Sequence, residues 1–478
     1  MPAFFAFNTF TSEPSASVGL NRIASNPEAK PYALEAVKHC KEEALERRGL
    51  KGTVEYVSDM FQYRVKYTTK KKYLVSIIIP SKDNFEILKT CIESIKKYTS
   101  YNNYEILIID NGSNNENRIK YKILCENNNC IYHYEKMEFN FSKMCNIGSE
   151  IAKGEFYLFL NDDIEIFQEE WLEIMLGQSS LKHVGAVGAK LLYPNSNTIQ
   201  HIGVTNLKIG PSHSQIGFDD RVIYHYGRNR MDYNFIAVTG ACLMVEKVKF
   251  KEVDGFDENL SIAYNDVDIC FKLIESKYYN VVRNDVILYH HESISRGIDD
   301  VNDEKMARLL KERKILFDKH EKFKGWDPFY NKNLTECKVD YDINFKFAPN
   351  RIVEENKKIQ DEWINGTCRA CIDSINIGDT ITINGWAFIS KSKFNNFNSK
   401  KIVLIDEHNN NLVLSTNIVI REDVTKAMDQ ERNLNLCGFT STIDCGLLKS
   451  QKYKVGLLLE NKLFCKNNFI LTDKKINL

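Results

Sequence analysis

The sequence predicts an α/β domain with a mainly parallel sheet flanked by helices, followed by a separate all-β sandwich. Two observations predict this arrangement. Between residues 73 and 335, continuous apolar runs rich in β-branched residues alternate with helix-like runs, which is typical of a parallel sheet covered by helices. From residue 366 onward, short β-like runs are separated only by Asn-rich turns such as EHNNN and LENK. A chain of 478 residues has room for about two or three domains of this size.

We expect two segments before the sheet. Residues 1–27 are polar and irregular, and we expect them to form a flexible tail. Residues 28–72 are expected to form a helical and β extension. Helix formers run up to the stop signal Gly49, and the short β-like runs TVEYV and YRVKY follow.

The α/β domain is expected over residues 73–335. Its main strands are predicted at YLVSIIIPSKD, YEILIIDNGS and GEFYLFLNDDIEI, with a weaker strand at CIYHYE. The helix after the first strand carries Ile87, Cys91 and Ile95 at four-residue spacing. A charged amphipathic helix is predicted over residues 303–324.

The C-terminal part is expected to comprise a linker, residues 336–365, and a β-sandwich accessory domain, residues 366–478. Trp386 is interpreted as a core residue of the sandwich, with glycan binding as the alternative. The CRAC motif at 368–371 has no second cysteine pair nearby, so a zinc site is disfavoured.

Composition excludes several classes of protein. Lys+Arg and Asp+Glu both number 64, and this zero net charge argues against a nucleic-acid partner. No apolar stretch reaches the roughly 18 residues of a transmembrane helix, and the N-terminus lacks the features of a signal peptide. The 13 cysteines are an odd number spread along the chain, which favours reduced thiols and a cytoplasmic location. The basic stretch at 66–73 leaves peripheral association with the inner face of the plasma membrane open beside a solvated turn.

Polar side chains follow the three strongest predicted strands. Ligands of such sheets bind beyond the carboxyl ends of the strands, so these residues indicate a site. They are Ser81, Asp83, Asp110, Asn111, Asn161, Asp162 and Asp163. The adjacent carboxylates of Asp162 and Asp163 suit Mg²⁺ or Mn²⁺, especially when substrate phosphates complete the coordination. The alternative is that the two acids only cap the helix that follows.

Two further motifs point to the same chemistry. In YNDVDICFKL, Asp266 is a candidate general base, and the alternative is that Asp266 and Asp268 only complement a helix dipole. In YHHESISRG, a histidine just past a strand is a candidate metal ligand, although a lone histidine is more often structural.

These motifs occur together in the order found in glycosyltransferase family 2, which residues 74 to about 300 resemble. VSIIIPSKD and EILIIDNGS resemble the first two strands of that family, and GEFYLFLNDD resembles the strand with its DxD-type metal motif. AVTGACLMV, VDGFDENL and YNDVDICFKL resemble the acceptor-side segment, and LYHHESISRG resembles the loop that supplies the last metal ligand. The resemblance implies the GT-A fold and an inverting enzyme. The QHIG at 200–203 and the SRG are similar to enzymes that build bacterial O-antigen and capsule polysaccharides.

The resemblance also implies roles for individual residues. Asp266 matches the catalytic base. Asp163 and His290 match the metal ligands, with His291 as the fallback. The positions that match nucleotide-sugar contacts are Pro80, Ser81, Asp83, Asp110, Asn146 and Asp162. Weaker acceptor-side matches are Gly240, Asn265 and Asp268. Two positions depart from the family, since Asn161 replaces the first Asp of a full DxD and Asn265 replaces the usual Glu before the base.

The implied reaction moves a sugar from a nucleoside-diphosphate donor, dTDP- or UDP-linked, to an oligosaccharide or lipid-linked glycan. A divalent cation, Mn²⁺ or Mg²⁺, would neutralise the leaving diphosphate while Asp266 accepts the acceptor's proton. A hexosyl and a rhamnosyl donor both fit. The main alternative is a degenerate scaffold or glycan-binding subunit. A hydrolase with paired carboxylates is a third option that the strand-end metal motif disfavours.

Overall fold

The computed structural model describes residues 31–291, 303–331, 334–335, 341, 350–364, 366–392, 395, 398–428, 430–431, 433–461 and 466–478. It divides into two compact units, Met1–Asp342 and Ile343–Leu478. The predicted tail, residues 1–27, lies outside the described residues.

The N-terminal extension is a helix and a β-hairpin. Helix α1 (Pro31–Arg47) is followed by a turn in which Gly49 has a φ of 60°, a left-handed conformation that glycine adopts readily. Strands β1 (Lys51–Val57) and β2 (Gln62–Thr68) then pair in antiparallel register. The two β-like runs that the sequence indicated are therefore one hairpin.

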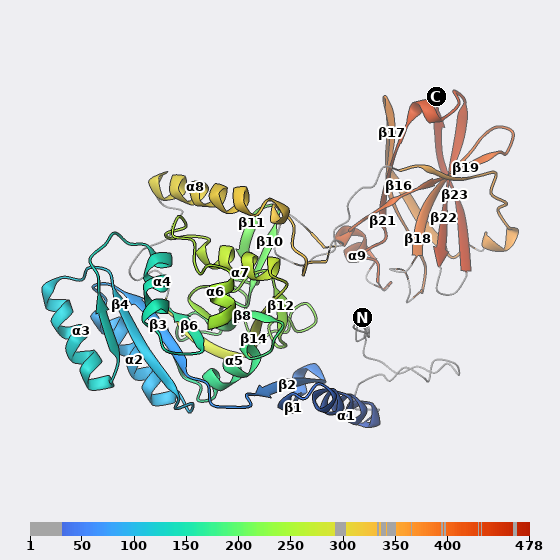
Figure 1. Cartoon of the computed structure of the whole chain (residues 1–478). Coiled ribbons are helices and arrows are strands. Elements are labelled where there is room, and N and C mark those ends of the chain that lie inside the picture. The colour runs from blue at the N-terminus through green and yellow to red at the C-terminus, as the bar shows by residue number, and fades with distance from the viewer. Residues whose placement is uncertain are drawn as a thin grey trace. The chain divides into compact units, whose positions relative to one another are not determined.

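A ten-stranded sheet forms the centre of the first unit, in the order β12-β14-β8-β13-β6-β3-β4-β5, with β7 paired to β14 and β9 paired to β8 (Figure 1). Strands β6, β3, β4 and β5 are mutually parallel. Beyond β6 the sheet becomes mixed, because β13 runs antiparallel to both β6 and β8. The strands are β3 (Val75–Ser81), β4 (Tyr104–Asp110), β5 (Ile131–Tyr134), β6 (Phe156–Leu160), β7 (Ile164–Glu165), β8 (Val184–Leu192), β9 (Ile199–His201), β12 (Tyr233–Phe235), β13 (Cys242–Glu246) and β14 (Tyr279–His290).

Helices cover both faces of this sheet. Successive side chains of β3 point to opposite faces and pack against different helices. Ile77 and Ile79 pack in one buried cluster with residues of α2, α3 and α5, whereas Ile78 packs in the opposite cluster with residues of α4, α6 and α7. The fold is therefore a three-layer α/β/α arrangement. The helices are α2 (Phe85–Tyr98), α3 (Asn115–Asn128), α4 (Phe141–Ile151), α5 (Trp171–Ser179), α6 (Lys247–Glu252), α7 (Asn265–Glu275) and α8 (Asp303–Lys319). A small hairpin, β10 (Val204–Leu207) and β11 (Gly210–His213), completes the unit.

The second unit is a β-sandwich of a five-stranded sheet, β15-β19-β18-β22-β23, and a four-stranded sheet, β16-β17-β21-β20. One buried cluster joins the two sheets, with Ile381 from one and Leu457 from the other. The elements are β15 (Ile352–Glu355), β16 (Cys368–Ile377), β17 (Thr380–Ile389), β18 (Asn398–Ile405), β19 (Asn411–Ser415), β20 (Asn417–Val419), α9 (Glu422–Ala427), β21 (Gly438–Asp444), β22 (Lys452–Asn461) and β23 (Lys466–Asn477).

Two details of the second unit bear on the sequence analysis. The range 336–365 was predicted as a linker, but β15 lies within it and pairs with β19, so the sandwich begins before residue 366. In the CRAC motif, Cys368 is buried and Cys371 is exposed on the same strand, so the two thiols do not share a site.

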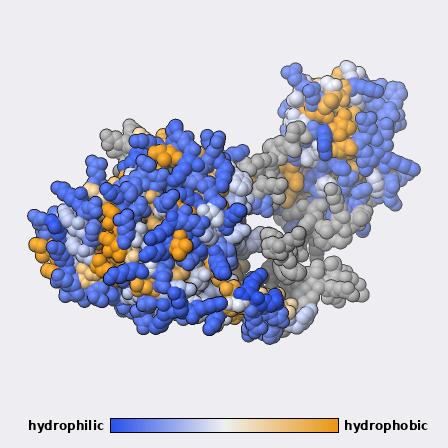
Figure 2. Space-filling view, viewed as in Figure 1, coloured by the Kyte–Doolittle hydropathy of each residue, from blue (hydrophilic) through white to orange (hydrophobic). Residues whose placement is uncertain are grey.

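No helix among the described residues is both long and apolar enough to cross a membrane. Figure 2 shows one face of the molecule, on which hydrophilic residues predominate and hydrophobic residues form separate groups.

Candidate active site

The carboxyl ends of β3, β4 and β6 bring together the polar residues that the sequence analysis selected. Ser81 is the register partner of Asp110 at the ends of β3 and β4. β6 runs parallel to β3 on its other side and leads directly into Asn161, Asp162 and Asp163. Pro80, one residue before the end of β3, is buried. The sheet therefore brings polar side chains from three separate parts of the chain together at one edge.

Asp162 faces the end of β3. Its Oδ2 accepts a hydrogen bond of 2.7 Å from the Ser81 hydroxyl, and the Asn84 amide lies 3.4 Å from the same oxygen. The Ser81 hydroxyl also lies 2.9 Å from the Tyr121 hydroxyl. The helix that follows begins only at Trp171, with Glu170 at its N-cap. Asp162 and Asp163 therefore do not cap it, and that alternative is wrong.

Asp83 shapes the loop after β3. Its φ is 54°, in the left-handed region. Its Oδ1 accepts hydrogen bonds from the backbone and side-chain amides of Asn114, at 2.9 and 2.8 Å, and from the side chain of Asn117 at 2.9 Å. This exposed carboxylate thus ties the β3 loop to the start of α3.

Asp110 lies below the surface rather than on it. The carboxylate is fully buried, and its Oδ1 accepts hydrogen bonds from the backbone amides of Gly112 and Ser113 at 2.9 and 2.8 Å. Its Oδ2 accepts one of 2.6 Å from the Tyr132 hydroxyl. The side chain thus holds the turn after β4.

Asp163 and His290 form the pair expected to hold a metal ion. The Asp163 Oδ1 lies 3.1 Å from the His290 Nε2, although the two residues are far apart in sequence. β14 brings His290 there, because His290 pairs with Ile164 of β7, the residue after Asp163. The fallback residue His291 points elsewhere, with its Nε2 2.9 Å from Glu165 Oε2.

A buried glutamine orients His290. The Oε1 of Gln200, at the middle of β9, lies 2.6 Å from the His290 Nδ1. A side-chain carbonyl oxygen accepts only, so Nδ1 donates this hydrogen bond and Nε2 faces Asp163. The Asn161 side-chain nitrogen also lies 3.3 Å from Nε2. An imidazole held through its second nitrogen is the usual arrangement of a metal-ligating histidine.

One carboxylate and one imidazole fit a divalent cation that also binds the diphosphate of a substrate. Within the described part of the chain, no group of three or more His, Cys, Asp or Glu side chains is arranged to hold a metal ion. Asp163 and His290 would therefore supply two ligands, and oxygens of a bound donor or water would supply the others, as is common for Mg²⁺ with phosphates.

Asp266 lies in the first turn of α7, where two backbone amides hold its carboxylate. Val267 N donates to Oδ1 and Gly240 N donates to Oδ2, each at 2.8 Å. Burial raises the pKa of Asp266, and the hydrogen bond from Gly240 opposes that rise. The N-cap residue, Tyr264, has a φ of 59°, which is strained for an aromatic residue. The carboxylate is thus fixed in place and made more basic than an exposed one.

Asp266 and the Asp163–His290 pair lie at the same end of the β6–β13 strand pair. Cys242 of β13 is the register partner of Leu160 of β6. Just beyond them, the Asn161 amide donates to the Ala241 carbonyl at 3.0 Å. Gly240, the next residue, holds Asp266. The short segment 240–241 therefore connects the base to the strand end that carries the metal ligands.

The remaining predicted residues divide between the site and the scaffold. The Asn265 Oδ1 accepts the Asp266 amide at 2.8 Å, so this side chain supports the turn that carries the base. Asn146 does not reach the donor side in this structure. Its amide bonds Phe256 through both its nitrogen and its oxygen, at 3.0 Å each, and thereby joins α4 to the 255–258 loop.

Asp268 belongs to the scaffold and not to the acceptor side. It is fully buried and pairs with Lys272 at 3.0 Å, Lys319 at 2.8 Å and His320 at 2.9 Å. Although burial acts to raise the pKa of Asp268, the hydrogen bond from His320 and the charges of Lys272 and Lys319 lower it to about 2. These contacts join α7 to the end of α8.

Two histidines near the site were not selected from the sequence. His201 is fully buried, and its Nε2 accepts the Thr239 amide at 3.3 Å. Its Nδ1 lies 3.2 Å from the Nδ1 of His213 on β11. Burial, together with the charges of His213 and His290, lowers the pKa of His201 well below its usual value, so the ring is neutral. The QHIG motif contains both Gln200 and His201 and was the available signal.

Comparisons with known proteins identify the family of part of the chain. Residues 76–253 match the family model described as "Glycosyl transferase family 2". The chain is 34% identical over 324 residues to the uncharacterized protein y4gI of Sinorhizobium fredii, covering 66% of this chain and 35% of that protein. It is 29% identical over 293 residues to the O-antigen biosynthesis protein RfbC of Myxococcus xanthus, covering 58% of this chain and 22% of that protein. The chain thus spans only about a third of the length of y4gI and about a fifth of the length of RfbC.

Among solved structures, the mannosyltransferase PcManGT from Pyrobaculum calidifontis, in complex with GDP-Man and Mn²⁺, is 13% identical. The TM-score between the two structures is 0.40, over 62% of this chain and 75% of that chain. The family model and the sheet with its strand-end motifs carry the assignment. Residues 76–253 thus form a glycosyltransferase family 2 domain, and the α/β unit has the GT-A fold.

Proposed function

We propose that this protein is an inverting, metal-dependent glycosyltransferase that adds a sugar to a growing, lipid-linked bacterial surface polysaccharide. The observation that carries the proposal is the joint placement of Asp163, His290 and Asp266 at one end of the β6–β13 pair. Such a transfer needs a pair of metal ligands and a separate carboxylate that acts as a base, and Asp266 is a partly buried carboxylate.

On the donor side, a nucleoside diphosphate would lie against the hydrogen-bonded pair of Ser81 and Asp162. Asp163 Oδ1 and His290 Nε2 would hold a divalent cation, Mn²⁺ or Mg²⁺, which when bound supplies positive charge against the diphosphate that leaves. The Asp83 and Asp110 turns set the shape of this edge. A dTDP- or UDP-linked donor is proposed, and both a hexosyl and a rhamnosyl group remain open.

On the acceptor side, Asp266 takes the proton of the attacking hydroxyl. Its raised pKa and fixed orientation suit a general base, because proton transfer is favoured as the hydroxyl attacks the anomeric carbon. The attack comes from the face opposite the leaving diphosphate, so a single displacement inverts the anomeric configuration. The acceptor class is proposed from the relative in O-antigen biosynthesis, of which this chain spans 22%.

Substituting Asp266 with asparagine tests the role of the base. Donor binding should be unchanged, whereas transfer of labelled sugar to a lipid-linked glycan fraction should fall by about 10²–10⁴-fold. Asp379→Asn is a control for the substitution itself, because Asp379 is exposed and lies between β16 and β17 of the β-sandwich. Equal loss of donor binding and transfer would show that Asp266 is not the base.

The alternative function is a degenerate GT-A scaffold or glycan-binding subunit. The retained ligand pair and the support of His290 by Gln200 speak against it, because a scaffold has no need of an oriented imidazole. Metal-dependent nucleotide binding distinguishes the two functions.

A further inference from the structure

A strongly basic hollow, separate from the candidate active site, lies where the N-terminal extension meets the sheet. It has a volume of about 730 Å³. Arg48 follows α1, Lys51 begins β1, Lys70 follows β2, and Lys182 lies between α5 and β8. The hairpin and the α/β domain therefore each contribute cations to one space.

This hollow is at the edge of the sheet opposite the active site. Tyr73, which lines it, precedes β3, and His183 precedes β8. The His183 carbonyl accepts the amide of Tyr279, the first residue of β14. The amino ends of three strands thus meet here, whereas Ser81, Asp162 and His290 stand at carboxyl ends.

The charge at this hollow is one-sided. The lining residues include four Lys and Arg side chains and no carboxylate, in a chain of zero net charge. Within the described ranges, none of these four side chains has an ion-pair partner. The negative ends of the α1 and α5 dipoles account for Arg48 and Lys182. They do not account for Lys51 and Lys70, which come from the hairpin, and like charges gathered this way repel one another.

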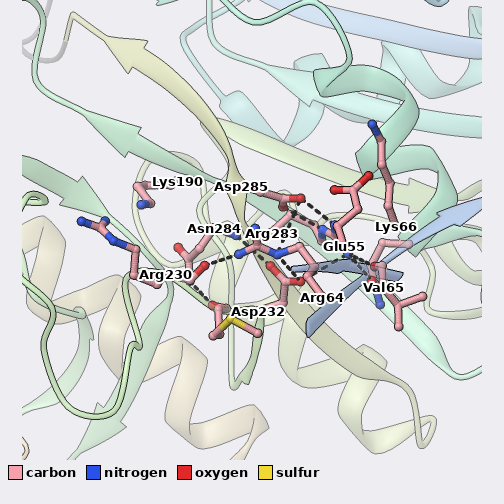
Figure 3. Close-up of polar contacts among 12 residues, drawn as sticks. Glu55, Arg64, Val65, Lys66, Lys190, Arg230, Asp232, Arg283, Asn284 and Asp285 are labelled. Carbon is pink, nitrogen blue, oxygen red and sulfur yellow. Dashed lines mark hydrogen bonds and ion pairs between the residues drawn. The ribbon is translucent and has the colours of Figure 1, made fainter. Parts of the chain in front are cut away.

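Buried contacts hold the hairpin wall of this hollow in place. Figure 3 shows Arg64 of β2 and Arg283 of β14 around the carboxylates of Asp232 and Asp285. Arg64 lies 3.1 Å from Asp232 and 3.7 Å from Asp285, and Arg283 lies 2.7 Å from Asp285. Arg283 also donates to the backbone carbonyl of Val65 in β2 at 2.9 Å.

A close backbone approach adds to this fixation. A Cβ atom at Gly177 of α5 would lie 1.9 Å from the Tyr67 carbonyl oxygen, so only glycine lets β2 pack this closely. The wall that carries Thr68 and Lys70 is therefore preorganised, which lowers the cost of binding a ligand there.

We infer that this basic hollow binds a ligand with two or more phosphate groups, at a site separate from the active site. A single carboxylate would balance one of the four charges, whereas two phosphate groups carry roughly three or more. The hydroxyls of Thr68, Thr69 and Tyr73 line the same space and are donors for phosphate oxygens. These phosphate groups can belong to one soluble molecule or to neighbouring lipid headgroups, and the experiment distinguishes the two sources.

The test is calorimetric titration of the full chain with pyrophosphate in EDTA, which removes the cation that the proposed active site requires. Wild-type protein should bind, and Lys70→Gln/Lys182→Gln should bind at least about tenfold more weakly, because each lost cation removes a charged hydrogen bond. Lys122→Gln/Lys251→Gln is the control, since both lysines are exposed and lie outside the hollow. Equal affinity of wild type and the Lys70/Lys182 variant, or no binding by wild type, would overturn the inference.

A sedimentation assay identifies the source of the phosphate. Full-length protein is mixed with phosphatidylglycerol vesicles or with phosphatidylcholine vesicles. Sedimentation with the anionic vesicles that is lost in Lys70→Gln/Lys182→Gln supports lipid headgroups as the ligand. Pyrophosphate binding without sedimentation supports a soluble diphosphate. Sedimentation that the variant retains would contradict a role of the hollow at the membrane. Lys70→Glu, which reverses the charge, should show a larger loss than Lys70→Gln in whichever assay is positive.

Discussion

Replacing Gln200 with leucine tests how the active site orients its metal-ligating histidine. Gln200 is 2% exposed, and its Oε1 accepts the Nδ1 proton of His290 at 2.6 Å. Leucine has a similar volume but no acceptor. The imidazole would then lose the partner that fixes its tautomer and ring orientation, and its Nε2 would no longer be held towards Asp163.

The expected magnitude follows from this one contact. Loss of such an outer hydrogen bond weakens metal binding by about 10- to 100-fold, or about 1.4–2.7 kcal/mol. The buried Nδ1–H left without an acceptor should also lower the free energy of unfolding by about 1–3 kcal/mol. Gln200→Glu retains an acceptor at the same position and should retain most of the metal affinity.

The assay is Mn²⁺ titration of the folded proteins with UDP or dTDP present, followed by the electron paramagnetic resonance of free Mn²⁺. Urea unfolding of each variant shows that the protein is folded under the assay conditions. Unchanged Mn²⁺ affinity in folded Gln200→Leu would show that Gln200 does not orient His290 for metal binding. So would equal losses in Gln200→Leu and Gln200→Glu.

Three further predictions concern stability. Asp268→Asn should lower the free energy of unfolding by about 3–5 kcal/mol in urea titrations, because it takes the carboxylate partner from the largely buried Lys272 ammonium. The folded-state pKa of Asp268 is depressed to about 2, so its contribution is present above pH 4, near the unfolded pKa, and is lost as the pH falls towards 2. The wild-type urea midpoint should fall over that range more steeply than that of Asp268→Asn. Gly177→Ala should loosen the hairpin against α5 and speed its proteolysis, whereas Gly378→Ala, which meets no atom within 4 Å, should not.

The sequence predicted the parts of the site that lie at strand ends. The apolar runs before Ser81 and Asp162 identify strands of a parallel sheet, and such strands end at a common edge. That reasoning brings these two residues together, and the structure joins them by a hydrogen bond of 2.7 Å. The pairing of Asp163 with His290 came from the family resemblance, since no local pattern links residues so far apart.

The sequence did not predict which polar side chains serve the scaffold. Asp110 is buried because the turn amides and the hydroxyl of Tyr132, on a neighbouring strand, surround it. Asp268 is paired by Lys319 and His320, some fifty residues away in the chain. β15 was missed because its four residues, IVEE, are half acidic and show no strand-like alternation. Each of these outcomes depends on tertiary contacts that local patterns do not encode.

The most direct test of the central claim is calorimetric titration of the protein with UDP, dTDP, GDP and CMP, each with and without Mn²⁺. This measurement needs no acceptor. A metal-dependent transferase should bind one of the diphosphates, this binding should require Mn²⁺, and Asp163→Asn should abolish both the requirement and the tight binding. Failure of every nucleotide to bind, with or without Mn²⁺, would contradict the account and favour the scaffold function.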